Sequence, residues 1–135
     1  MKTSCLTIGA LWRTLGVLGL GALVTAVASP SFAVTSSPRE DGARYGQAIG
    51  ATLMCYKLET TDELAALKTR YAGSELDVFS AEAEKIVAAW RAVQTCEKAG
   101  GPNSCRLTQV WSCQEALREI GPNGSALPGL VRIKQ

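Results

Sequence analysis

Residues 81 to 120 read AEAEKIVAAWRAVQTCEKAGGPNSCRLTQVWSCQEALREI, with apolar residues at helical spacing on both sides of an Ala-Gly-Gly-Pro-Asn break. Three of the five cysteines in the chain lie inside this stretch: Cys96, Cys105 and Cys113. We therefore expect two antiparallel helices joined by disulfide bonds, a cross-linked helical hairpin.

The helix before the break has the clearest pattern in the chain. A single helical stripe contains Phe79, Ala83, Ile86, Trp90 and Val93. Trp90 lies at the centre of this stripe, so we expect it in the core rather than on a binding surface.

The helix after the break is expected to begin at Asn103 or Ser104 and to end at Gly121. Its main inward face comprises Val110, Cys113, Leu117 and Ile120. Leu107 and Trp111 point to an adjoining side. They are either a second packing contact or the first candidates for a surface that binds a partner.

A first helix should begin near Ala43. Its apolar face holds Tyr45, Ile49, Thr52, Leu53 and Tyr56. Glycines recur every four residues on a neighbouring strip, at positions 42, 46 and 50. Because glycine weakens a helix, this strip indicates either a second helix packed close against it or a frayed helix start.

A second, short helix is expected between Thr60 and Gly73. Thr60 and Glu63 have the spacing of a capping box, and Gly73 is the expected stop. The helix that follows would then be capped by Ser74 or Ser80.

Both ends of the chain are polar or rich in glycine and proline. Residues 34–42 are expected to form a flexible arm before a helical domain at 43–121, and residues 122–135 an irregular tail without a helix. The tail carries the apolar residues Leu127, Leu130 and Val131, so it either packs back or binds a partner.

Residues 1–33 have the form of a secretory signal peptide. Two basic residues precede an apolar run of 14 residues, and small residues stand before a cleavage site after Ala33, with Ala28 as the alternative. A permanent membrane anchor would need about 20 apolar residues. We therefore expect a periplasmic or secreted protein.

Charge and composition exclude several classes of partner and of catalytic site. Without residues 1–33 the chain has 12 basic and 12 acidic side chains, which argues against nucleic acid or an anionic membrane as the main partner. The chain has no histidine, which excludes histidine general bases, Ser-His-Asp sites and histidine metal sites. We expect no cofactor.

Four cysteines remain after export, and an even number in a short exported chain indicates two disulfides. Position along the hairpin favours Cys96 with Cys105 and Cys55 with Cys113, because residues 96 and 105 lie level across the break. The alternative joins Cys55 to Cys105 and Cys96 to Cys113. A zinc site made of all four thiolates lacks the usual close Cys-x-x-Cys pairs.

The expected fold is all-α, a small four-helix disulfide-linked bundle. The expected function is that of an exported, non-enzymatic protein that acts by protein–protein interaction as a chaperone, an assembly accessory or an inhibitor. Two alternatives come from other classes. One is a small helical enzyme that uses Arg70, Glu84, Lys85 and Arg91 on an anionic substrate. The other is a thiol–disulfide oxidoreductase. The absence of a Cys-x-x-Cys motif from this chain argues against it.

Overall fold

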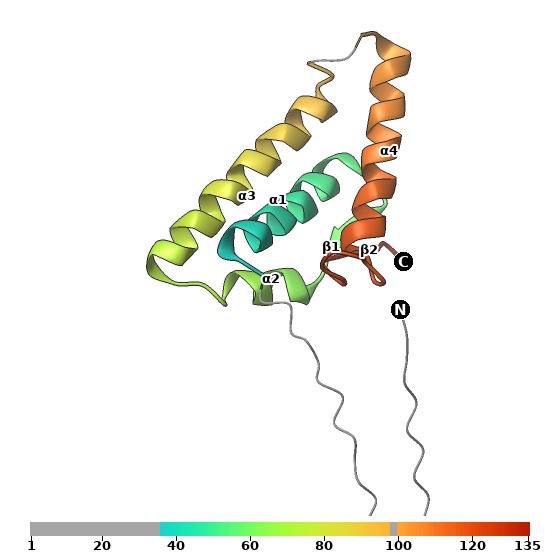
Figure 1. Ribbon diagram of the computed structural model, residues 1–135. Helices are drawn as coiled ribbons and strands as arrows, with labels where there is room; N and C mark the ends of the chain where they lie inside the picture. The colour runs from blue at the N-terminus through green and yellow to red at the C-terminus, as the bar shows by residue number, and fades with distance from the viewer. Residues whose placement is uncertain (1–35, 98–99) are drawn as a thin grey trace, which may run out of the picture. The chain divides into compact units, whose positions relative to one another are not determined.

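The computed structural model describes residues 36–97 and 100–135, which form four helices and one two-stranded antiparallel sheet (Figure 1). In chain order the elements are α1 (Pro38–Met54), β1 (Leu58–Thr60), α2 (Asp62–Lys68), α3 (Gly73–Gln94), α4 (Pro102–Ile120) and β2 (Val131–Ile133). The protein is thus mostly helical, as expected. A four-helix bundle is not confirmed, because only α1 and α3 pack side by side along their lengths. The expected signal peptide lies outside the described residues.

α1 begins at Pro38 and not near Ala43. The Ser37 hydroxyl accepts a hydrogen bond from the Glu40 backbone N–H at 3.2 Å, and the Glu40 carboxylate accepts one from the Ser37 N–H at 2.9 Å. The same N–H lowers the pKa of Glu40. Proline suits the first turn of a helix, where its missing N–H would have no partner. The expectation of a flexible arm at 34–42 is therefore wrong for residues 38–42, while residues 34 and 35 lie outside the described residues.

The glycine strip of α1 packs directly against α3. A Cβ atom added at Gly46 would lie 2.9 Å from the Ile86 Cβ and 3.0 Å from the Ala83 Cα, and one added at Gly50 would overlap the Trp90 ring. Distances this short leave no room for a side chain. Of the two interpretations of this strip, the close helix contact is confirmed.

The expected capping box of α2 is wrong. Thr60 ends β1, and α2 is preceded by Thr61, whose hydroxyl donates to the Gly129 carbonyl of the tail and not to the helix backbone. α2 ends at Lys68, and Gly73 does not stop it but starts α3 with a φ of +55°. Ser74 and Ser80 therefore both lie inside α3 and cap nothing.

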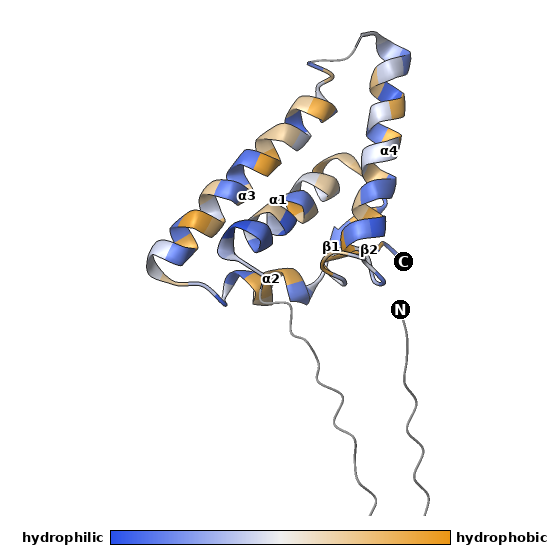
Figure 2. Cartoon of the chain, viewed as in Figure 1, coloured by the Kyte–Doolittle hydropathy of each residue, from blue (hydrophilic) through white to orange (hydrophobic). Residues whose placement is uncertain are grey.

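The buried stripe of α3 covers less of the helix than expected. Phe79 and Ala83 are buried, at 1% and 7% exposure, and the Tyr45 and Tyr71 rings pack against Phe79. Trp90 is only partly buried, although it contacts the core. Apolar and hydrophilic residues alternate along α3 (Figure 2), as in other amphipathic helices.

The expected disulfide pairing is the one in the structure. Cys55 bonds Cys113 with their Cα atoms 5.8 Å apart, and Cys96 bonds Cys105 at 5.5 Å. Cys96 lies just beyond α3 in the left-handed region, with a φ of +62°. The first bond fastens the end of α1 to α4, and the second fastens the end of α3 to the start of α4.

α4 meets α3 near the loop that joins them and diverges from it further along (Figure 1). The C-terminal half of α4 packs on α1 and on the sheet instead, through the buried side chains of Ala116 and Ile120. The hairpin is therefore cross-linked as expected, but it is open, and α1 lies between its two arms.

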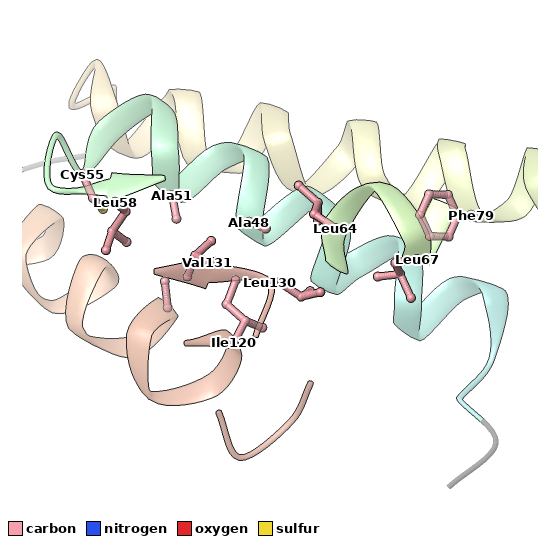
Figure 3. Packing of buried hydrophobic residues seen from close by; sticks show 11 residues of the cluster. Ala48, Ala51, Cys55, Leu58, Leu64, Leu67, Phe79, Ile120, Leu130 and Val131 are labelled. Carbon is pink, nitrogen blue, oxygen red and sulfur yellow. The ribbon is translucent and has the colours of Figure 1, made fainter. Parts of the chain in front are cut away.

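The tail closes the core. β2 pairs with β1 in the register Leu58 to Ile133 and Thr60 to Val131. Leu130 and Val131 are 2% and 0% exposed. With Ile120 they lie opposite Ala48 and Ala51 of α1 (Figure 3). The expectation of an irregular tail at 122–135 is wrong for this strand, and packing back is the alternative that holds.

Candidate functional site

Two large apolar side chains are exposed on the outer side of α4. Leu107 is 52% exposed and Trp111 is 64% exposed, and they are one helical turn apart. Residues 107–114 carry no charged side chain. Exposed tryptophans are typical anchors of protein interfaces. We call the surface made by Leu107 and Trp111 the α4 outer face.

Two disulfide bonds hold the part of α4 that carries this face. Cys105 and Cys113 lie on either side of Leu107 and Trp111 in the sequence, and each is bonded to a different helix end. Fixed attachment at both points gives the outer face one orientation. A partner would then lose little of its binding free energy to ordering this surface.

The three tail residues that were also candidates for partner binding do not form a binding surface. Leu130 and Val131 are buried, and Leu127 is partly buried against the core. Their burial follows from the pairing of β2 with β1 and from the hydrogen bond that the Leu130 N–H donates to the Ile120 carbonyl at 3.0 Å. This part of the site prediction is wrong.

Val110 does not face the core as expected, because its side chain is 46% exposed. α4 diverges from α3, so only the side of α4 that faces α1 and the sheet is covered. Val110 lies at the edge of that side and lines a groove.

The groove has a volume of about 520 Å³ and lies between the α1–β1 turn, α4 and β2. We call it the α4–β2 groove. Its apolar lining consists of Met54, Tyr56, Leu58, Val110, Leu117 and Ile133 together with the Cys55–Cys113 disulfide. Two amide side chains, Gln109 and Gln114, and one charged side chain, Lys57, complete the lining.

Sequence reasoning missed this groove. Tyr56 and Val110 were each assigned to the inward face of a helix, and Ile133 to the tail. Only the pairing of β2 with β1 brings Ile133 beside the end of α1. No pattern within one segment of the sequence reports such a contact between distant segments.

A buried carboxylate connects α1 to the loop before α3. Asp41 is 1% exposed and accepts a hydrogen bond of 2.7 Å from the Tyr71 hydroxyl, and the Arg70 guanidinium lies 4.0 Å away. Burial, with the hydrogen bond to Asp41, raises the pKa of Tyr71 to about 12. The hydroxyl is neutral at physiological pH and acts as a donor that satisfies Asp41, which is a structural role.

A second polar cluster connects α1 to α4. The Glu119 carboxylate accepts hydrogen bonds from Arg44 at 2.6 Å and from Gln47 at 2.8 Å. Arg44 also donates to the Gln47 side-chain oxygen at 2.8 Å. The three side chains satisfy one another, so this cluster too stabilises the fold.

Within the described residues, no hydrogen bond or ion pair joins any two of the four residues proposed for the enzyme alternative. Lys85 pairs with Glu82 on its own helix at 2.9 Å, and Arg70 lies beside Asp41. Glu84 and Arg91 are exposed on α3. The lining of the α4–β2 groove includes none of the four. This arrangement offers no convergent anion site.

The cysteines are divided between two separate bonds, and Cys105 and Cys113 are about 12 Å apart along α4. Four thiolates at such positions cannot surround one zinc ion. Within residues 36–97 and 100–135 there is no cluster of three or more Cys, Asp or Glu side chains placed to hold a metal.

No protein-family model, curated protein sequence or solved structure matches this chain. None of the helices in the described ranges combines the length and the apolar character that crossing a membrane requires.

Proposed function

We propose that this protein is an exported, non-enzymatic binding protein that contacts other proteins through the α4 outer face, as a chaperone, an assembly accessory or an inhibitor. The observation that supports this proposal is the exposure of Leu107 and Trp111 between two disulfide-bonded cysteines. Exposure of a rigid apolar surface to water is unfavourable in free energy, and a partner that covers the surface removes this penalty.

Two disulfides also support export, because such bonds persist in the periplasm or outside the cell and are rare in the cytosol. The signal-peptide pattern of residues 1–33 points to the same compartments. The balanced charge of residues 34–135 favours a protein partner over nucleic acid.

Site-specific photo-crosslinking in the producing cell tests the proposal. A photoreactive amino acid at position 107 should give a distinct protein adduct, because this position lies within the α4 outer face. The matched control is position 78, where Val78 is 43% exposed on α3, far from that face in sequence. A Trp111→Asp change in the position 107 variant should remove the adduct. Identical adducts from both positions, or adducts from neither, would contradict the proposal.

Aggregation assays separate a chaperone from the other two roles. The chain lacks histidine, the side chain that usually gains a proton near neutral pH. An acid trigger would therefore have to use carboxyl groups, which in model peptides gain a proton around pH 4, so an acid-triggered chaperone would act only below about pH 5. Suppression of client aggregation should then appear at about pH 3 and not at about pH 7. Equal suppression at both values would indicate a chaperone without an acid trigger, and none at either would leave the assembly and inhibitor roles.

A further inference from the structure

The two disulfide bonds are embedded differently in the protein. Cys55 belongs to the buried core, and Cys113 packs against it. Within the described ranges, neither Cys96 nor Cys105 is part of that core cluster, and the bond between them lines a surface cavity of about 770 Å³ together with Arg106. The Cys55–Cys113 bond also lines a cavity, the α4–β2 groove. Because a small reagent can reach both bonds, access alone does not decide which one opens first.

The backbone at the cysteines separates the two bonds. Cys96 has a φ of +62°, in the left-handed region, which is unfavourable for a residue that carries a side chain. Cys55 has a φ of −94°, and Cys113 lies within α4. When the Cys96–Cys105 bond opens, the backbone at Cys96 is free to leave the left-handed region. Relief of this conformation therefore favours opening of the Cys96–Cys105 bond.

The helix ends make the two sulfur atoms of this bond unequal. Cys105 lies in the first turn of α4, at the positive end of the helix dipole, and Arg106 follows it. In the described part of the chain, no carboxylate lies within 4.0 Å of the Arg106 guanidinium. Cys96 comes after the negative end of α3 and is followed by Glu97. A thiolate is therefore better stabilised at Cys105, which makes Cys105 the better leaving group.

The Cys55–Cys113 bond has no comparable stabilisation from a helix N-terminus. Cys55 is the C-cap of α1, at the negative end of that helix. Cys113 lies in the second half of α4, beyond the first turn in which the dipole acts. Lys57 lines the groove beside this bond, but its ammonium lies over the Tyr56 ring, 5.7 Å from the centroid. We therefore expect this bond to resist exchange.

We propose that the Cys96–Cys105 bond is a thiol-exchange site that a dithiol opens reversibly, while the Cys55–Cys113 bond stays closed. One thiolate of the dithiol attacks the Cys96 sulfur, the Cys96–Cys105 bond breaks, and its electron pair leaves on the Cys105 sulfur. The second thiolate then attacks the dithiol sulfur of this mixed disulfide and releases the Cys96 thiolate. The dithiol is oxidised to a disulfide, and the two cysteines gain its two electrons and two protons.

Opening this bond separates the end of α3 from the start of α4. The Cys55–Cys113 bond still fastens the middle of α4 to α1. The protein is the substrate of this exchange and not its catalyst. The inference is independent of the proposed function, which rests on the exposure of the α4 outer face.

Dithiothreitol tests the inference on the full disulfide-bonded protein without denaturant. Thiols released over time are blocked with N-ethylmaleimide and located by peptide mass mapping. Cys96 and Cys105 should be labelled about tenfold faster than the other pair, the ratio expected from relief of one unfavourable backbone conformation. NMR of the partly reduced protein should show changed shifts at Thr95 and Gln109 and unchanged shifts at Leu58.

A monothiol tests which sulfur is attacked. After brief exposure to 2-mercaptoethanol and quenching with N-ethylmaleimide, the mixed disulfide should be found at Cys96 and the maleimide at Cys105. The reverse distribution would overturn the proposal.

A charge variant tests the stabilisation of the leaving group. Arg106→Gln should slow the opening of the Cys96–Cys105 bond about threefold, within the range for one exposed charge pair. The matched control is Arg39→Gln, which removes the same charge from an exposed position on α1 and should leave the rate unchanged.

Equal rates for the two bonds, faster opening of the Cys55–Cys113 bond, or global unfolding when the Cys96–Cys105 bond opens would overturn the inference. An unchanged rate in the Arg106→Gln variant would overturn it as well. Trp111→Asp should leave the exchange rate intact, so failure of the proposed function and failure of this inference are distinguishable.

Discussion

α1 contacts α3 and α4 by different means. Against α3 it packs through glycines, with Gly46 close to the backbone of Ala83, and no covalent bond joins the two helices. Against α4 it is held by the Cys55–Cys113 disulfide and by the ion pair between Arg44 and Glu119.

The difference shows two ways of holding helices in a small domain. Glycines at every fourth position let the two helix backbones approach closely. Close packing, with the contact between the Tyr45 and Phe79 rings and the hydrogen bond that Gln94 donates to the Leu53 carbonyl at 3.1 Å, keeps the helices together. α4 crosses α1 over a short distance and buries few side chains there, so covalent and charged links replace packing. The same short contact leaves the α4 outer face and the α4–β2 groove uncovered.

The largest expected effect comes from removing the bond between α1 and α4. In the loop-entropy account, Cys55→Ala with Cys113→Ala should lower the free energy of unfolding by about 4 kcal/mol, because this bond closes a long loop. Cys96→Ala with Cys105→Ala should lower it by about 3 kcal/mol, because its loop is short. Urea unfolding of both double variants measures these values, and equal losses would contradict the account.

Breaking the glycine contact comes next. Gly46→Val places a branched side chain against the α3 backbone and should lower the free energy of unfolding by about 2 kcal/mol through overpacking. Gly100→Ala is the control, since a Cβ there meets no atom within 4 Å, and should change stability by less than about 0.5 kcal/mol. A stable Gly46→Val protein would show that the two helices can separate without cost.

A substitution of Tyr71 tests the hydrogen bond that connects the loop before α3 to Asp41 of α1. Tyr71→Phe removes the donor to buried Asp41 and should lower the free energy of unfolding by about 1 to 2 kcal/mol at neutral pH. Tyr56→Phe, at a tyrosine that is 78% exposed, should have almost no effect.

The same residue predicts a pH dependence. The pKa of Tyr71 is raised from 10.0 to about 12, so the folded protein keeps the hydroxyl proton where the unfolded chain has lost it. Its contribution is complete below pH 10 and is lost as the pH rises toward 12. Unfolding at increasing alkaline pH should therefore show a smaller loss for Tyr71→Phe than for the unaltered protein. Parallel curves would contradict the assignment.

The smallest effect is expected for the ion pair on the α4 side. A double-mutant cycle of Arg44→Ala and Glu119→Ala should give a coupling of about 1 kcal/mol, because both side chains are partly exposed. The coupling should shrink as salt is added. A coupling near zero would leave the disulfide as the main link between α1 and α4.

Local features of the fold were predictable because their signals lie within a few residues. The stripe through Phe79 and Ala83 follows from helical spacing, and the pairing of Cys96 with Cys105 follows from their positions around one loop. The capping box of Ser37 and Glu40 is also a local signal, but the polar residues and the proline at 34–42 favoured a flexible arm, whereas proline is favoured in a first helical turn.

Features that depend on distant segments were not predictable in this way. Val110 was assigned to the core because helical periodicity gives its direction but not whether a neighbour covers that direction. Leu130 and Val131 were assigned to a tail with two possible fates, because the strand that pairs with them is remote in the sequence. Leu107 and Trp111 are exposed without the help of a distant segment, and their role in binding a partner stays a prediction.

By itself the sequence determined that the chain forms amphipathic helices and which cysteines can meet, because helical period and loop length act over short distances. Only the tertiary structure decided that α4 diverges from α3, that the tail completes the core as a strand, and that an apolar groove opens between α4 and β2. These outcomes depend on which surfaces cover one another, and that is set by contacts between segments far apart in the chain.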